Sequence, residues 1–163
     1  MREEAERFVG HLEEMKGQKV WTRARAALRR SLAFEPGTYP PAIPFVEPWI
    51  HGAEGWRREA YYLVAALYAL KDGDHREGRT LAKALRERAR DSESVERRFL
   101  ALLAADRDEI AFRMRQTVAL TEDGLDFARL LQDLWGWFDA ERWVQARWAR
   151  EFYSGEESKE VAT

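Results

Sequence analysis

The run YYLVAALYAL at residues 61–70 decides the fold class, because it is apolar on nearly every side of a helix. A helix that is apolar all round has to be buried, so other helices are expected to surround this one. The segment KDGDHREG at residues 71–78 carries the glycines and aspartates of a turn and ends the helix. The sequence therefore predicts a central buried helix from about residue 56 to residue 70.

The stretches on either side of this run show helical periodicity, since apolar residues recur three and four positions apart and few segments alternate as a strand would. All five prolines lie within residues 36–48, which predicts an irregular connection there. Asp106 and Glu109 have the spacing of a capping box at the start of a helix. Further helices are expected at residues 3–15, 20–34, 80–90, 93–104, from 106 onward, 125–138 and 141–153.

These elements predict an all-α fold, a single-domain helical bundle of about seven or eight helices. The length of 163 residues, with 45% hydrophobic and 34% charged residues, fits one folded domain with its own core. The bundle is expected to occupy residues 1–154. Residues 155–163 are expected to form a polar, disordered tail.

Composition also indicates a cellular location. Cysteine is absent from the sequence, which excludes disulfide bonds and thiolate metal sites and is typical of a reducing compartment. The charged, helix-like N-terminus lacks the features of a signal peptide, and no apolar run approaches the roughly 18 residues that cross a bilayer. We therefore expect a cytoplasmic protein with no membrane partner.

Few residue patterns indicate catalysis. The three histidines lie far apart and belong to no metal-binding motif, and the sequence has no glycine loop of the kind that cradles phosphates. We expect no cofactor, no metal site and no small-molecule substrate. One enzymatic alternative stays open, a carboxylate-based nuclease, if Asp126, Asp133 and Asp139 converge. The simpler interpretation makes these aspartates helix-face and capping residues, so we expect no enzymatic activity.

Charge is segregated along the chain, although 27 basic and 29 acidic residues give a net charge of only −2. No acid occurs between Met15 and Phe34, where six lysines and arginines fall. A helix at residues 20–34 turns Ala24 and Leu28 inward and leaves its arginines outside. Arginine outnumbers lysine 22 to 5, and its planar guanidinium makes bidentate contacts to phosphates. The alternative is a solvated face that acids from other helices neutralise.

Two further basic clusters, ERRF at residues 96–99 and RMRQ at residues 113–116, favour binding of nucleic acid. If the helices form a bundle, one continuous basic surface is expected. Most of the tryptophans are assigned to the core rather than to base stacking, because Trp135, Phe138, Trp148 and Phe152 recur at inward-facing spacings. The candidate nucleic-acid-binding residues are Lys19, Arg23, Arg25, Arg29, Arg30, Lys83, Arg86, Arg97, Arg98 and Arg113.

Six segments together resemble the CasB family, the small subunit of the type I-E CRISPR surveillance complex called Cascade. Each segment is only a helix fragment, but their order and spacing extend over most of the chain. The segments are RAALRRSL at 25–32, VAALYAL at 64–70, SVERRFLALLAAD at 94–106, RMRQTVAL at 113–120, DFARLLQDLWGW at 126–137 and WVQARWAREFY at 143–153.

The resemblance implies a non-catalytic, all-helical subunit that is present in two copies beside the other Cascade subunits. Its partners would be the crRNA and the target DNA, including the displaced single strand, which it would hold to stabilise the R-loop. From the family pattern we carry over the arginines of RAALRR and ERRF, and the other candidate residues follow from charge placement. The rival hypothesis is a helical adaptor or scaffold protein whose arginines contact acidic protein surfaces.

Overall fold

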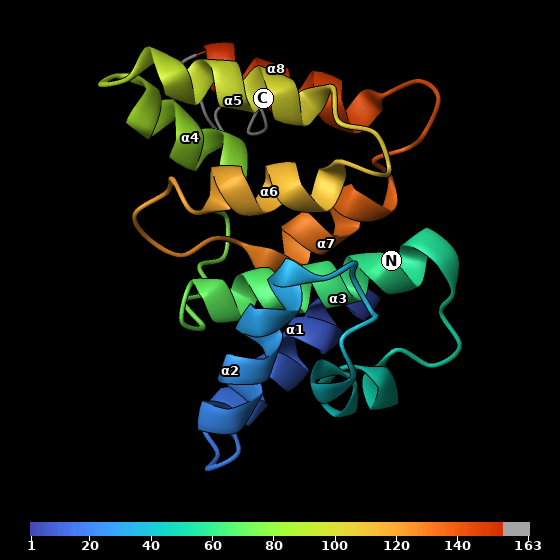
Figure 1. Ribbon diagram of the computed structural model, residues 1–163. Helices are drawn as coiled ribbons and strands as arrows, with labels where there is room; N and C mark the ends of the chain where they lie inside the picture. Colours follow the sequence, from blue (N-terminus) through green and yellow to red (C-terminus); the bar gives the residue numbers. More distant parts are fainter. Residues whose placement is uncertain (155–163) are drawn as a thin grey trace.

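A computed structural model describes residues 1–154 of the chain. Within this range the chain forms eight α-helices, three short 3-10 helices and no strand, which confirms the all-α prediction (Figure 1). The expected tail at residues 155–163 lies outside the described residues, and the single-domain division stays a prediction. The elements are α1 (Arg2–Lys16), α2 (Trp21–Arg30), η1 (Ser31–Ala33), η2 (Pro40–Phe45), η3 (Glu47–Trp49), α3 (Gly55–Leu70), α4 (Leu81–Ala89), α5 (Glu93–Leu103), α6 (Ile110–Val118), α7 (Phe127–Trp135) and α8 (Trp143–Ser154).

Helix α3 is the centre of the core, as its continuous apolar run predicted. Residues 60–69 are all buried, on every side of the helix. Helices α2 and α7 pack on α3, and α1 packs on α7, whereas α4, α5 and α8 pack on one another in the other half of the molecule. Figure 1 shows α6 and α7 between these two halves. No described helix is both long and apolar enough to cross a membrane.

Several helix boundaries differ from the predicted ones. Helix α7 ends at Trp135 rather than near 138, and Gly136, a poor helix former, follows it. Gly136 lies so close to the Trp143 ring that an added Cβ atom would come within 2.6 Å of it. The assignment of Phe138 to the core was wrong, because the α-helical spacing on which it rested ends at Trp135. Phe138 is 40% exposed and packs edge-on against Trp56. Trp148 and Phe152 are buried as predicted, and Trp135 is partly buried against the core.

Two other segments also differ in local structure from the prediction. The Asp106 carboxylate accepts hydrogen bonds from the backbone of Asp108 and Glu109, so it caps the turn before α6, which begins at Ile110. The proline segment forms η2 and η3 instead of a wholly irregular connection. Its Phe45 is buried, so the segment packs against the core even though prolines interrupt its hydrogen bonds.

Two loops far apart in the sequence, one before α4 and one before α7, are joined by backbone hydrogen bonds. The Arg76 N–H donates to the Leu125 carbonyl at 2.8 Å, and the Leu125 N–H donates to the Asp74 carbonyl at 3.2 Å. Gly124 is required at this crossing, since a Cβ atom there would lie 1.8 Å from the Asp74 carbonyl oxygen. The loop after α3 is therefore held firmly against the start of α7.

Candidate nucleic-acid interface

Helix α2 presents a basic face to solvent, as its amphipathic pattern predicted. Ala24 and Leu28 are fully buried, which directs the intervening arginines outward. Arg23, Arg29 and Arg30 are exposed, and Arg25 is half-buried. Lys19 is exposed in the turn that precedes the helix.

The alternative of neutralisation by acids from other elements is partly correct for this face. The Arg25 guanidinium donates to the Asp72 carboxylate at 2.7 and 2.8 Å, and Arg29 lies 3.9 Å from the same oxygen. Asp72 follows α3, and its side chain is 68% exposed. Such exposed ion pairs are worth little and weaken with salt, so a phosphate could compete with Asp72 for both arginines.

A second basic group lies on helices α4, α5 and α6, which pack in that order. Lys83 and Arg86 are half-buried on α4, and the Lys83 ammonium lies 3.4 Å from the Gly78 carbonyl. Arg97 is exposed on α5, while Arg98 and Arg113, on α5 and α6, are half-buried. The ten candidate residues thus form two groups in different halves of the molecule.

Helix α6, which carries Arg113 of the second group, also contacts the chain that follows α2. The 3-10 helix η1, which continues α2, packs against α6 as well as α3. Arg115 is exposed on α6 and was missing from the sequence-based set of candidates. The sequence did indicate that Arg115 is exposed. Met114 faces the core, and the next residue of a helix points about 100° away from it.

Many other arginines are already paired with acids, which separates them from most of the candidate residues, although Arg25 and Arg29 also face Asp72. Arg57, Arg58, Arg79, Arg88 and Arg107 each form an ion pair at 3.2 Å or less with a glutamate. Six candidate residues form no ion pair with any other residue in the described part of the chain: Lys19, Arg23, Arg30, Arg97, Arg98 and Arg113. These six are the cations best placed to meet the phosphates of a partner.

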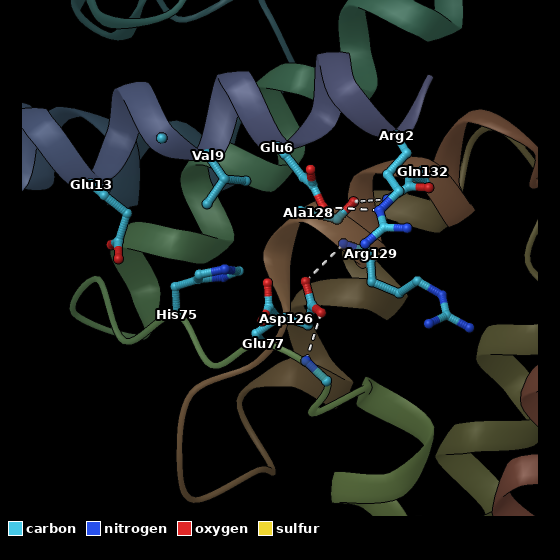
Figure 2. A pocket seen from close by; sticks show the side chains of 12 residues that line it. Arg2, Glu6, Val9, Glu13, His75, Glu77, Asp126, Ala128, Arg129 and Gln132 are labelled. Carbon is cyan, nitrogen blue, oxygen red and sulfur yellow. Dashed lines mark hydrogen bonds and ion pairs between the residues drawn. The ribbon is translucent and has the colours of Figure 1, made fainter. Parts of the chain in front are cut away.

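The cleft beside α1 has the opposite electrostatic character. It has a volume of about 640 Å³ and lies between α1, the loop at residues 75–78 and the start of α7 (Figure 2). Carboxylates outnumber cations in its lining, and Arg2 is hydrogen-bonded to Glu6 at 3.0 Å. A polyanion would be repelled from this cleft, so it does not belong to the basic interface.

The three aspartates of the nuclease alternative have separate local roles. Asp126 caps α7 by accepting from the Arg129 N–H, and Asp139 accepts from the Glu141 N–H. Asp133 is buried and bound by Arg147 and by the Trp148 indole. Among the described residues, no group of three or more histidines or carboxylates is placed to hold a metal ion.

Comparisons with known proteins agree with this architecture. The family described as CRISPR-associated protein Cse2 matches residues 24–153. A Cse2 protein from Thermus thermophilus is 66% identical over 158 residues, which cover 95% of this chain and 93% of the relative. The crystal structure of CasB from Thermus thermophilus is similar with a TM-score of 0.88 and 65% identity, covering 93% of this chain and 98% of that one.

A third likeness concerns the fold alone. A chain of a structure described as a CRISPR RNA-guided surveillance complex has a TM-score of 0.75 at 21% identity, over 94% of this chain and 93% of that one. The matched residues of the family include α3, α4, α5 and α6 and most of α2, whereas Lys19 and Arg23 lie before the match. The chain therefore belongs to the CRISPR-associated Cse2 family, also called CasB.

Proposed function

We propose that this protein is a non-catalytic subunit of a type I-E Cascade complex, where it holds crRNA, target DNA and the displaced single strand and so stabilises the R-loop. It would act beside other Cascade subunits and a second copy of itself. Family membership supports the assignment to a CRISPR system. The surveillance-complex chain of the same fold supports the assignment to Cascade.

The observation that carries the proposal is the set of cations that have no acidic partner within the described chain. A displaced strand can have any sequence, so its binder has to contact the backbone rather than base edges. Arginines such as Arg23, Arg30 and Arg97 can supply such contacts without breaking an internal ion pair. Because replacing a DNA duplex by a heteroduplex is nearly balanced in free energy, a few backbone contacts would be enough to favour the R-loop.

Fluorescence anisotropy with labelled DNA tests this proposal. Binding of unrelated sequences is expected to be equally strong and to weaken steeply as salt rises, because phosphate contacts release counterions. The Arg23→Gln/Arg30→Gln/Arg97→Gln variant should lose affinity and reduce the salt slope by about three, roughly one for each contact.

The chain offers a matched control with the same change in charge. Arg2, Arg76 and Arg107 are exposed arginines already paired with Glu6, Asp74 and Glu59. Replacing these three by Gln should reduce affinity much less, since those guanidinium groups are occupied.

Two results would count against the proposal. Equal losses in the two triple variants would show that binding depends on total charge rather than on the candidate surface. No binding at low salt, with the fold intact, would instead favour the adaptor hypothesis, in which arginines contact acidic proteins.

A further inference from the structure

The outer face of α6 carries an aromatic ring that the fold does not use. Phe112 is 61% exposed, the largest exposed fraction among the large apolar side chains described apart from Met1. Four of the other exposed aromatic residues contact a second ring: Phe34 stacks on Tyr39, Trp49 on His11, Phe138 meets Trp56 and Tyr153 meets Phe152. Trp143 instead lies against Gly136 and beneath the Arg147 guanidinium. Phe112 lies beneath the Arg113 guanidinium, whose central carbon is 5.7 Å from the ring centroid.

The surroundings of Phe112 are charged rather than apolar. Arg113 and Arg115 flank it on the same helix, and neither forms an ion pair with another described residue. The exposed face continues with Ala119 toward the end of the helix. A protein-docking site would be expected to surround such a ring with further apolar side chains, and this face has few of them.

We propose that Phe112 is a stacking platform for one unpaired base of a single-stranded nucleic acid, with Arg113 and Arg115 holding the adjoining phosphates. Every base has a π-face, so this contact adds affinity without sequence preference. Bases inside a duplex are already stacked and cannot offer that face. The ring would therefore make the basic surface discriminate between a single strand and a duplex.

The charge around α6 also gives the strand a direction. Asp108 and Glu109 are exposed before the first turn of the helix, where they would repel a phosphate. Arg115 lies about one turn beyond Phe112 and nearly two turns beyond these acids. The strand is therefore expected to leave Phe112 toward Arg115 and the end of α6 at Val118.

This inference rests on the proposed function, and binding of the full-length chain to a labelled 20-nucleotide oligo(dT) tests the two separately. Phe112→Leu keeps an exposed apolar side chain and removes the ring, so affinity for oligo(dT) should fall by about fivefold or more, as for loss of one base stack. The salt slope should stay the same, because stacking releases no counterions. Duplex DNA should bind the variant as it binds the wild type, and Phe112→Trp should retain the affinity.

Photo-crosslinking gives a direct readout that does not depend on high affinity. Oligo(dT) that carries iododeoxyuridine should crosslink to Phe112, which lies in the tryptic peptide DEIAFR at residues 108–113. If wild-type protein binds in a salt-dependent way but Phe112→Leu binds oligo(dT) equally well, stacking is refuted and the basic surface stands. If the wild type binds no nucleic acid at low salt, the proposed function fails as well.

Discussion

Replacing Asp133 by Ala should destabilise the protein strongly, because its carboxylate is buried among groups that depend on it. Asp133 is 3% exposed, and its Oδ2 accepts from the Trp148 indole at 2.7 Å, while Arg147 donates to Oδ1. The indole N–H would lose its partner in a site where Trp148 is only 2% exposed, at a cost of about 1–3 kcal/mol.

Loss of the ion pair with Arg147 adds a smaller cost in free energy of unfolding. The Arg147 side chain keeps 25% exposure, so water can replace part of the lost ion pair and the cost falls to about 1 kcal/mol, below that of a fully buried pair. The sum is about 3 kcal/mol, which should lower Tm by about 6–12 °C for a chain of this size. Asp133→Asn keeps an acceptor for the indole and should recover about half of the loss.

Thermal unfolding followed by circular dichroism, with urea titration at 25 °C, measures both variants. Asp139→Ala is the control, because that exposed carboxylate caps only the Glu141 N–H and its loss should cost about 1 kcal/mol or less. A Tm of Asp133→Ala within 2 °C of the wild type would refute the reasoning from burial. An Asn variant as unstable as the Ala variant would refute the role assigned to the indole hydrogen bond.

Three other predictions follow from particular contacts. Asp72→Asn removes the acid that faces Arg25 and should raise affinity for oligo(dT) at low salt about two- to fivefold, an effect that anisotropy would show fading as salt rises. Gly124→Ala brings a Cβ atom into the backbone of Asp74 and should cost about 1–3 kcal/mol of unfolding free energy in a urea titration. Burial lowers the pKa of His11, so the unfolded chain binds a proton more readily and stability should fall as pH drops below about 6.5. Urea titrations at pH 7.5 and 5.5 should show a smaller difference for His11→Gln than for the wild type.

Those features that depend on neighbours in sequence could be predicted. The continuous apolar run at residues 61–70 leaves no polar side for solvent, so the buried position of α3 was predictable from the sequence alone. The outward direction of the α2 arginines followed from the spacing of Ala24 and Leu28 for the same reason. The CasB resemblance rested on helix fragments in the right order, and the family match over residues 24–153 confirms it.

Features that depend on contacts across the chain could not be predicted. Arg25 and Asp72 are 47 positions apart, and no local pattern indicates that they pair. Phe138 was assigned to the core on helical spacing, but α7 ends at Trp135, where Gly136 lies against a ring from the next helix. Phe112 gave no sequence signal either, because an aromatic residue in an amphipathic helix is usually buried.

The cations on α2 and α4–α6 lie apart from the carboxylates of the cleft beside α1, and this separation affects the protein before it binds any partner. With a net charge of −2 the chain has little long-range attraction to nucleic acid, yet its charge distribution gives it a dipole moment. The electric field of a polyanion would therefore orient such a molecule more than it would attract it. The free subunit would therefore bind nucleic acid at low salt but only weakly at the ionic strength of the cell, where its basic face would engage a strand mainly when other contacts already hold it there.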